Sequence, residues 1–190
     1  MALRAQTQIG ARNSPGDRRR LLALEIRTSK LGFAVLESPT RLLDWGMRSF
    51  GEEHHRFRLA VSDRIATLLA FHQPLTVIVR LRKCHSAFAD RRFRAVMDAI
   101  RAEARRHSTR FRVVAAHHVR DHFAPSGLVT KYEIAESLAK QFEELSWRLP
   151  SQRKPYQSES PAMMVFDALA TGIASLDRGI LSSRDVRPLL

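Results

Sequence analysis

Two carboxylates stand alone in the most apolar stretches of this sequence. Glu25 interrupts the run 21–26 (LLALEI), and Asp167 is the one acid in the segment 161–176 (PAMMVFDALATGIASL). A buried carboxylate must be paired with a cation, protonated or bound to a metal, because its removal from water is costly. Two such acids meeting at one end of a sheet are the minimum for holding Mg²⁺ or Mn²⁺, since hard cations prefer oxygen ligands.

The buried position of Glu25 can also be explained without a catalytic or metal-binding role. Strand alternation could turn its side chain toward a wet edge of the sheet, or an arginine such as Arg27 could neutralise it. The residue types alone leave these alternatives open beside a metal site.

The other candidate reactive residues favour a structural interpretation. His117, His118 and His122 are not accompanied by a carboxylate or cysteine cluster at zinc spacing, so we expect no structural zinc. Cys84 is followed by His85, but neighbours in sequence rarely face each other productively. We therefore expect an inert cysteine.

The length and composition of the chain indicate one soluble domain. Its 190 residues can bury an adequate core, and a hydrophobic fraction of 44% is ordinary for a globular protein. No apolar run approaches the roughly 20 residues that span a bilayer, and the basic N-terminus lacks the apolar segment of a secretory signal. The single cysteine excludes an intramolecular disulfide. We expect a cytoplasmic protein with no membrane partner.

The charge of the chain predicts an acidic partner. Lysine and arginine number 32 against 19 acids, which gives a formal net charge of +13. Such an excess most often binds nucleic acid through phosphate contacts and counterion release. A basic helical face can also be merely solvated. One predicted helix, 90–107, carries arginines on such a face: Arg91, Arg92, Arg94, Arg101, Arg105 and Arg106.

Hydrophobic periodicity predicts an α/β domain with a mixed five-stranded sheet flanked by helices. The expected strands are 21–26, a partner ending at 36 after the turn 28–30, 41–50, 75–80 and 110–116, and the expected helices are 54–72, 90–107, 119–123, 130–147 and 160–176. The strand 75–80 returns after a helical crossover and should lie parallel to the first strand. Residues 1–20 are expected to form a disordered basic arm, 21–178 the domain and 179–190 a tail.

Two helix starts carry capping signals. Thr130 is followed three residues later by Glu133, the pattern of a capping box, and that helix is expected to run to about Trp147. A polar linker, 149–158, separates it from the last helix. Ser160 is the expected cap of that helix, with Pro161 at its first position.

The order of elements and three segments resemble the RuvC-type Holliday junction resolvases of the RNase H-like fold. The segments are VIVR, HHVRDHFAPSGLVTKYEIAESLA and FDALATGIASL, and the resemblance covers residues 21–176. It implies an RNase H-like fold, branched DNA as partner, a role in DNA recombination and repair, and two divalent ions, Mg²⁺ or Mn²⁺, that activate water and stabilise the leaving oxygen. It also allows a homodimer.

The sequence departs from the family pattern at the residues that would hold those ions. Glu25 stands where the family has aspartate, Arg80 where it has glutamate, and Met164 where it has the first acid of a helical pair; Asp167 is retained. Arginine repels a metal and pairs readily with carboxylates, so we predict that Arg80 pairs with Glu25 or Asp167. Glu159, just before the last helix, is a conceivable substitute ligand.

The resemblance assigns roles to individual residues. Glu25 and Asp167 are its catalytic and metal-binding candidates, and its nucleic-acid-binding candidates are Arg80, Arg82, Lys83, Arg120 and Lys131. The leading hypothesis is a protein that binds branched or duplex DNA, rather than RNA, with a degraded two-metal site. The alternative is a structure-specific endonuclease that depends on Mg²⁺ or Mn²⁺, and a third is an interaction protein for another acidic partner.

Overall fold

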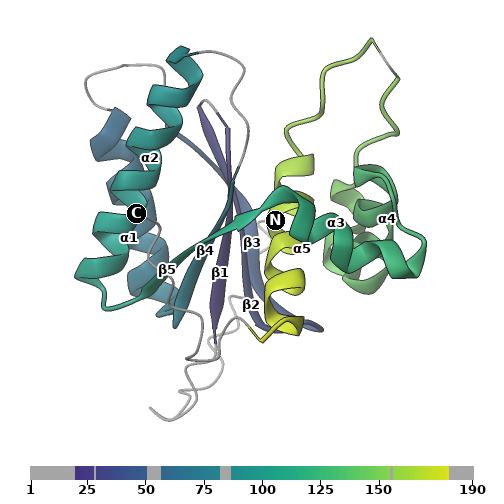
Figure 1. Ribbon diagram of the computed structural model, residues 1–190, viewed down its shortest axis with the longest axis horizontal. Coiled ribbons are helices and arrows are strands. Elements are labelled where there is room, and N and C mark those ends of the chain that lie inside the picture. The colour runs from purple at the N-terminus through teal and green to yellow at the C-terminus, as the bar shows by residue number, and fades with distance from the viewer. Residues whose placement is uncertain (1–19, 28, 51–56, 82–86, 155, 180–190) are drawn as a thin grey trace, which may run out of the picture.

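A mixed five-stranded sheet forms the centre of the fold, with strand order β3-β2-β1-β4-β5 (Figure 1). The computed structural model describes residues 20–27, 29–50, 57–81, 87–154 and 156–179. The strands are β1 (Leu21–Ile26), β2 (Lys30–Ser38), β3 (Arg41–Ser49), β4 (Thr76–Leu81) and β5 (Arg110–Ala115). The first three form an antiparallel meander, while β4 runs parallel to β1 and β5 parallel to β4. This is the predicted architecture.

Helices cover both faces of the sheet (Figure 1). One face carries α1 (Phe57–His72) and α2 (Ala87–Arg106); the other carries α3 (Ala116–Phe123), α4 (Lys131–Gln141) and α5 (Met163–Asp177), with the short 3-10 helices η1 (Ala124–Ser126) and η2 (Glu143–Arg148). No helix in the described ranges is both long and apolar enough to cross a lipid bilayer.

The central strand β1 contributes to both cores because its side chains alternate between the two faces. All six of its residues are buried. Leu22 and Leu24 join the core under α1 and α2, whereas Leu21 and Ala23 join the core under α5. The same alternation directs Glu25 toward the α5 face.

Close contact between α5 and the sheet depends on Gly32 in β2. A Cβ atom at Gly32 would lie 2.6 Å from the backbone oxygen of Met164, closer than any side chain tolerates. The missing side chain therefore lets the first turn of α5 rest on β2. This contact fixes the height of α5 over the sheet, and with it the position of Asp167.

Several helix boundaries differ from the sequence-based expectation. The helices expected to begin at 90 and 119 begin three residues earlier, at Ala87 and Ala116. The helix that begins after Thr130 ends at Gln141 and not near Trp147, because the backbone becomes extended at Phe142 (φ −121°, ψ 92°) and turns that buried ring into the core. Ser160 does accept a hydrogen bond from the Ala162 N–H (3.3 Å), but regular α-helix begins only at Met163. The expectations for residues 1–19, 54–56 and 180–190 fall outside the described ranges.

Candidate functional site

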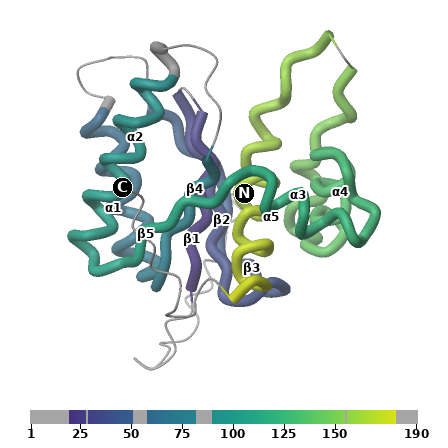
Figure 2. The backbone as a smooth tube through the Cα atoms, in the orientation of Figure 1, coloured from purple at the N-terminus to yellow at the C-terminus, as the bar shows by residue number. Residues whose placement is uncertain are grey.

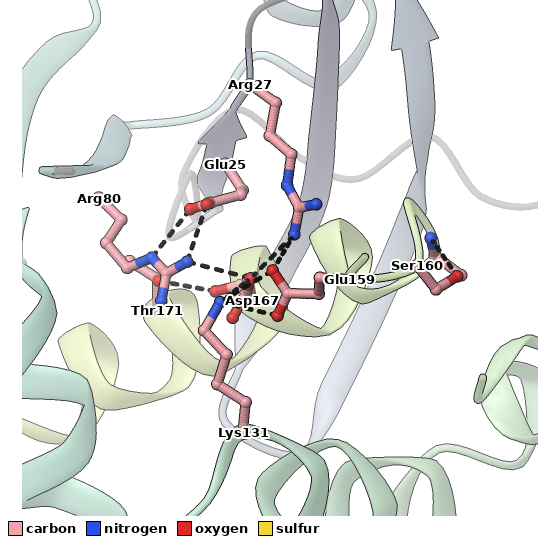
Figure 3. A network of polar contacts seen from close by, with 9 residues as sticks. Glu25, Arg27, Arg80, Lys131, Glu159, Ser160, Asp167 and Thr171 are labelled. Carbon is pink, nitrogen blue, oxygen red and sulfur yellow. Dashed lines mark hydrogen bonds and ion pairs between the residues drawn. The ribbon is translucent and has the colours of Figure 1, made fainter. Parts of the chain in front are cut away.

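Glu25, Arg80 and Asp167 meet on the α5 face of the sheet, at the ends of β1 and β4. The parallel register pairs Leu24 with Val79, so Glu25 and Arg80 follow at the same level on neighbouring strands. Both preceding residues belong to the core under α1 and α2, and alternation therefore turns Glu25 and Arg80 toward α5. Asp167 lies on the second turn of α5 and faces them (Figure 3).

The Arg80 guanidinium bridges the two buried acids. Its Nε and Nη2 atoms donate to the two carboxylate oxygens of Glu25, both at 2.8 Å, in a bidentate arrangement. The same Nη2 lies 3.0 Å from Asp167 Oδ2. The side chains of Glu25, Asp167 and Arg80 are only 2%, 7% and 11% exposed. The predicted ion pair of Arg80 is therefore confirmed with both acids.

Two further cations complete the network (Figure 3). Lys131 Nζ lies 3.0 Å from Asp167 Oδ2 and 3.0 Å from Glu159 Oε1. Arg27 Nη2 lies 2.6 Å from Glu159 Oε2 and 3.9 Å from Asp167 Oδ2. Each acid thus contacts at least one cation, and Asp167 at the centre contacts all three.

Local structure explains why Lys131 reaches this network. The Thr130 hydroxyl accepts a hydrogen bond from the Glu133 N–H (3.2 Å), and the Glu133 carboxylate accepts one from the Thr130 N–H (2.8 Å). This is the predicted capping box, and it fixes the start of α4. Lys131 is the first residue of that helix, so the cap determines where its side chain begins.

Burial and pairing pull the pKa values of this network in different directions. Burial raises the pKa of Glu25, and the hydrogen bonds and charge of Arg80 oppose that rise. Burial alone would lower the pKa of Arg80, but Glu25 and Asp167 outweigh it and raise the pKa. Burial likewise works against the low pKa of Glu159, which Lys131 and Arg27 together hold below its usual value. Arg80 therefore remains a permanent cation between the acids.

The residues present do not fit the two-metal site that the family resemblance implies. Both oxygens of Glu25 are taken by Arg80, and Asp167 Oδ2 and Glu159 are held by cations. Met164 is fully buried and offers a thioether in place of a carboxylate, a soft ligand that hard cations disfavour. Within the described ranges, no three His, Cys, Asp or Glu side chains gather closely enough to hold a metal ion.

A cavity of about 720 Å³ opens beside the network. Its wall includes Glu25, Arg80, Lys131 and Asp167, and it extends over α3 to Arg120. The cavity also has an apolar wall, formed by Leu81, Val119, Ile134, Ala135, Phe166 and Ala170. The structure thus brings five of the seven residues predicted for the site to one cavity. Arg82 and Lys83 lie outside the described residues, as do Cys84 and His85.

The roles of two further residues were only partly foreseen. Arg27, a candidate neutraliser of Glu25 in the sequence, pairs with Glu159 and Asp167 instead. Glu159, a candidate substitute metal ligand in the sequence, lies in the site as a partner of cations. The usable signal for both is their place in the chain, directly after β1 and shortly before α5.

Two of the three histidines lie beside each other, and the third pairs with a carboxylate. His117 lines the cavity and its ring lies 4.3 Å from that of His118. His122 Nε2 lies 3.3 Å from Asp177 Oδ2 near the end of α5.

No family model and no curated protein matches the sequence. Solved structures do match in fold. Thermus thermophilus RuvC in complex with a Holliday junction substrate has a TM-score of 0.66 and 15% identity, covering 86% of this chain and 96% of that one. Another T. thermophilus RuvC structure gives the same TM-score and identity over 85% and 96%. The yeast mitochondrial Holliday junction resolvase Ydc2 follows at a TM-score of 0.56 and 12% identity, over 89% and 82%.

These likenesses establish the fold of this chain. The mixed five-stranded sheet flanked by helices is RuvC-like and belongs to the RNase H-like class. The fold predicted from the sequence is therefore confirmed.

Proposed function

We propose that this chain binds branched or duplex DNA through its basic surface and does not cleave it by metal-dependent chemistry. One observation carries the second half of the proposal. The guanidinium of Arg80 sits between Glu25 and Asp167 and makes close contacts with both.

A divalent ion would have to displace Arg80 before it could use Glu25. Breaking a buried pair by removing one partner costs about 3–5 kcal/mol, because the other charge is left uncompensated. Here the displaced guanidinium would also repel the incoming ion, since both are positive. Occupancy by Mg²⁺ at ordinary concentrations is therefore unfavourable.

An unpaired arginine at the edge of the cavity supports the DNA-binding half of the proposal. Arg120 is exposed at the edge of the cavity, and its side chain pairs with no group in the described part of the chain. Within the network, Arg27, Arg80 and Lys131 balance Glu25, Glu159 and Asp167, so Arg120 adds a net positive charge at the mouth. Such a charge suits a phosphate, and the formal charge of +13 favours the same partner.

The neighbours in fold agree with this partner class. The T. thermophilus RuvC structure is a complex with a Holliday junction. By analogy we expect the same form of DNA, with the cavity facing it. A homodimer, as the resemblance allows, remains part of the proposal.

Binding is tested by titrating a labelled four-way junction and a duplex at two ionic strengths. We expect affinity that falls steeply with salt. Arg120→Gln should weaken binding, while Arg58→Gln, which removes an exposed arginine from α1 on the other face of the sheet, should have a smaller effect. Absence of binding at low salt contradicts the proposal.

Cleavage is tested on the same junction with Mg²⁺ and with Mn²⁺. We expect no nicking by the wild type at any concentration of either ion. Metal-dependent nicking that disappears in Asp167→Asn would overturn this part of the proposal and restore the endonuclease alternative.

A further inference from the structure

The segment between η2 and α5 stands clear of the helices beside it (Figure 2). Its residues 149–158 read LPSQRKPYQS. Near its middle, Tyr156 is 79% exposed, the largest exposed fraction among the large hydrophobic residues of the described ranges. Arg153 and Lys154, both exposed, directly precede this part of the segment. We call residues 150–154 and 156–158 the projecting loop.

The projecting loop is held by its own hydrogen bonds and by its foot. The Lys154 N–H donates to Gln157 Oε1 (3.1 Å), and the Gln157 N–H donates to the Lys154 carbonyl (3.0 Å). At the foot, Glu159 is tied to Lys131 and Arg27 of the charge network. The loop therefore has a defined position relative to the candidate site.

The projecting loop does not close onto the body of the protein. A cavity of about 550 Å³ lies between it and the start of α4, lined among others by Tyr132, Gln152, Arg153 and Ser160. Tyr156 is absent from the lining of that cavity and from both hydrophobic cores. Packing within the chain thus gives no reason for an aromatic side chain at this position.

An exposed aromatic ring flanked by cations has a well-defined use on nucleic acids. Base–aromatic stacking contributes about 1–3 kcal/mol per base and tolerates any sequence. It needs a free base face, which the interior of a duplex does not offer because neighbouring pairs cover both faces. Bases at a branch point or in a single strand do offer one, and adjacent cations hold the neighbouring phosphates.

We propose that Tyr156 stacks on an unstacked base at the branch point of the bound DNA, with Arg153 and Lys154 on the adjacent phosphates. The inference rests on the proposed function and narrows its substrate class to DNA with an open base face. It gives the projecting loop the task of distinguishing branched DNA from plain duplex.

The test compares three variants on a four-way junction and on a duplex of equal length. Tyr156→Ala should weaken junction binding about 5- to 150-fold, the loss of one base stack, and leave duplex binding unchanged. Tyr156→Phe keeps the ring and should bind like the wild type. Phe71→Ala removes another aromatic of matched exposure, 78%, from the end of α1 on the other face of the sheet and should change neither affinity.

A 2-aminopurine probe at the branch point gives a second measurement. Its fluorescence should change on binding of wild type or Tyr156→Phe and should remain nearly constant with Tyr156→Ala. Equal junction affinities of wild type and Tyr156→Ala, or an equal loss on junction and duplex, would overturn the inference while leaving DNA binding intact. Failure of the wild type to bind either DNA would overturn the proposed function together with it.

Discussion

Replacing Arg80 by methionine tests whether the guanidinium holds the site together. The change removes two hydrogen bonds of 2.8 Å to Glu25 and a contact of 3.0 Å to Asp167. Asp167 keeps Lys131, but Glu25, 2% exposed, loses its hydrogen-bonded cation. Such an orphaned buried charge costs about 3–5 kcal/mol, and screening by water reduces this little at so low an exposure.

Urea unfolding at pH 8 measures this loss. With a slope of about 2 kcal/mol per molar urea, the midpoint of Arg80→Met should fall by about 2 M. The matched control is Arg94→Met, which removes an exposed arginine paired with Asp90 on α2 and should cost less than about 0.5 kcal/mol. Glu25→Gln combined with Arg80→Met should recover much of the loss, because the buried position 25 then carries no unpaired charge while Asp167 keeps Lys131.

The same variant should depend on pH with a definite sign. Burial already raises the pKa of Glu25, and removal of Arg80 takes away the main influence that opposes the rise. A raised carboxyl pKa contributes stability at low pH that is lost as the pH rises through the folded-state value. Arg80→Met should therefore be less destabilised relative to wild type at pH 5 than at pH 8. A loss below about 1 kcal/mol at pH 8, or no change with pH, would refute the reasoning.

Three further predictions follow from the site and the core. Because Lys131 and Arg27 hold the pKa of Glu159 low, this residue contributes stability that is lost as the pH falls below the ordinary glutamate value of 4.5. In Glu159→Gln, the free energy of unfolding measured against pH should therefore fall less steeply below that pH than in the wild type. Gly32→Ala forces a Cβ to 2.6 Å from the Met164 oxygen and should cost about 1–3 kcal/mol in urea unfolding, whereas Gly46→Ala, whose nearest neighbour is the Phe33 ring at 3.1 Å, should cost less. The double variant Arg80→Glu with Met164→Asp should have a lower melting temperature than the wild type without metal. Mn²⁺ should restore part of that loss, because the metal binds only the folded state, whereas the melting temperature of the wild type should not change with Mn²⁺.

The charge network links these tests to the proposed function. Three cations, Arg27, Arg80 and Lys131, pair with the same three acids that would otherwise bind a metal. Variants of these residues therefore change stability and metal affinity together. Arg120 and Tyr156 lie outside the network, so their variants report on DNA binding alone.

Local patterns in the chain were enough to predict the elements and their order. The apolar run around Glu25 predicted a strand, and the capping box at Thr130 and Glu133 predicted the start of α4. The crossover rule placed the strand ending at Arg80 parallel to the first. These are local signals or simple topological rules, so a single sequence carries them. The prediction that Arg80 pairs with Glu25 or Asp167 also needed the family resemblance, which places Arg80 where the family has glutamate.

The tertiary structure alone decided which charges pair and where the helices stop. Arg27 is two residues from Glu25 in sequence, yet it pairs with Glu159, which lies 132 residues away. Side-chain direction on the strand and the docking of α5 on Gly32 decide that choice, and neither is encoded in local spacing. Phe142 ends α4 for the same kind of reason: its ring is buried by packing against the core, and that gain overrides the helical pattern that continues toward Trp147.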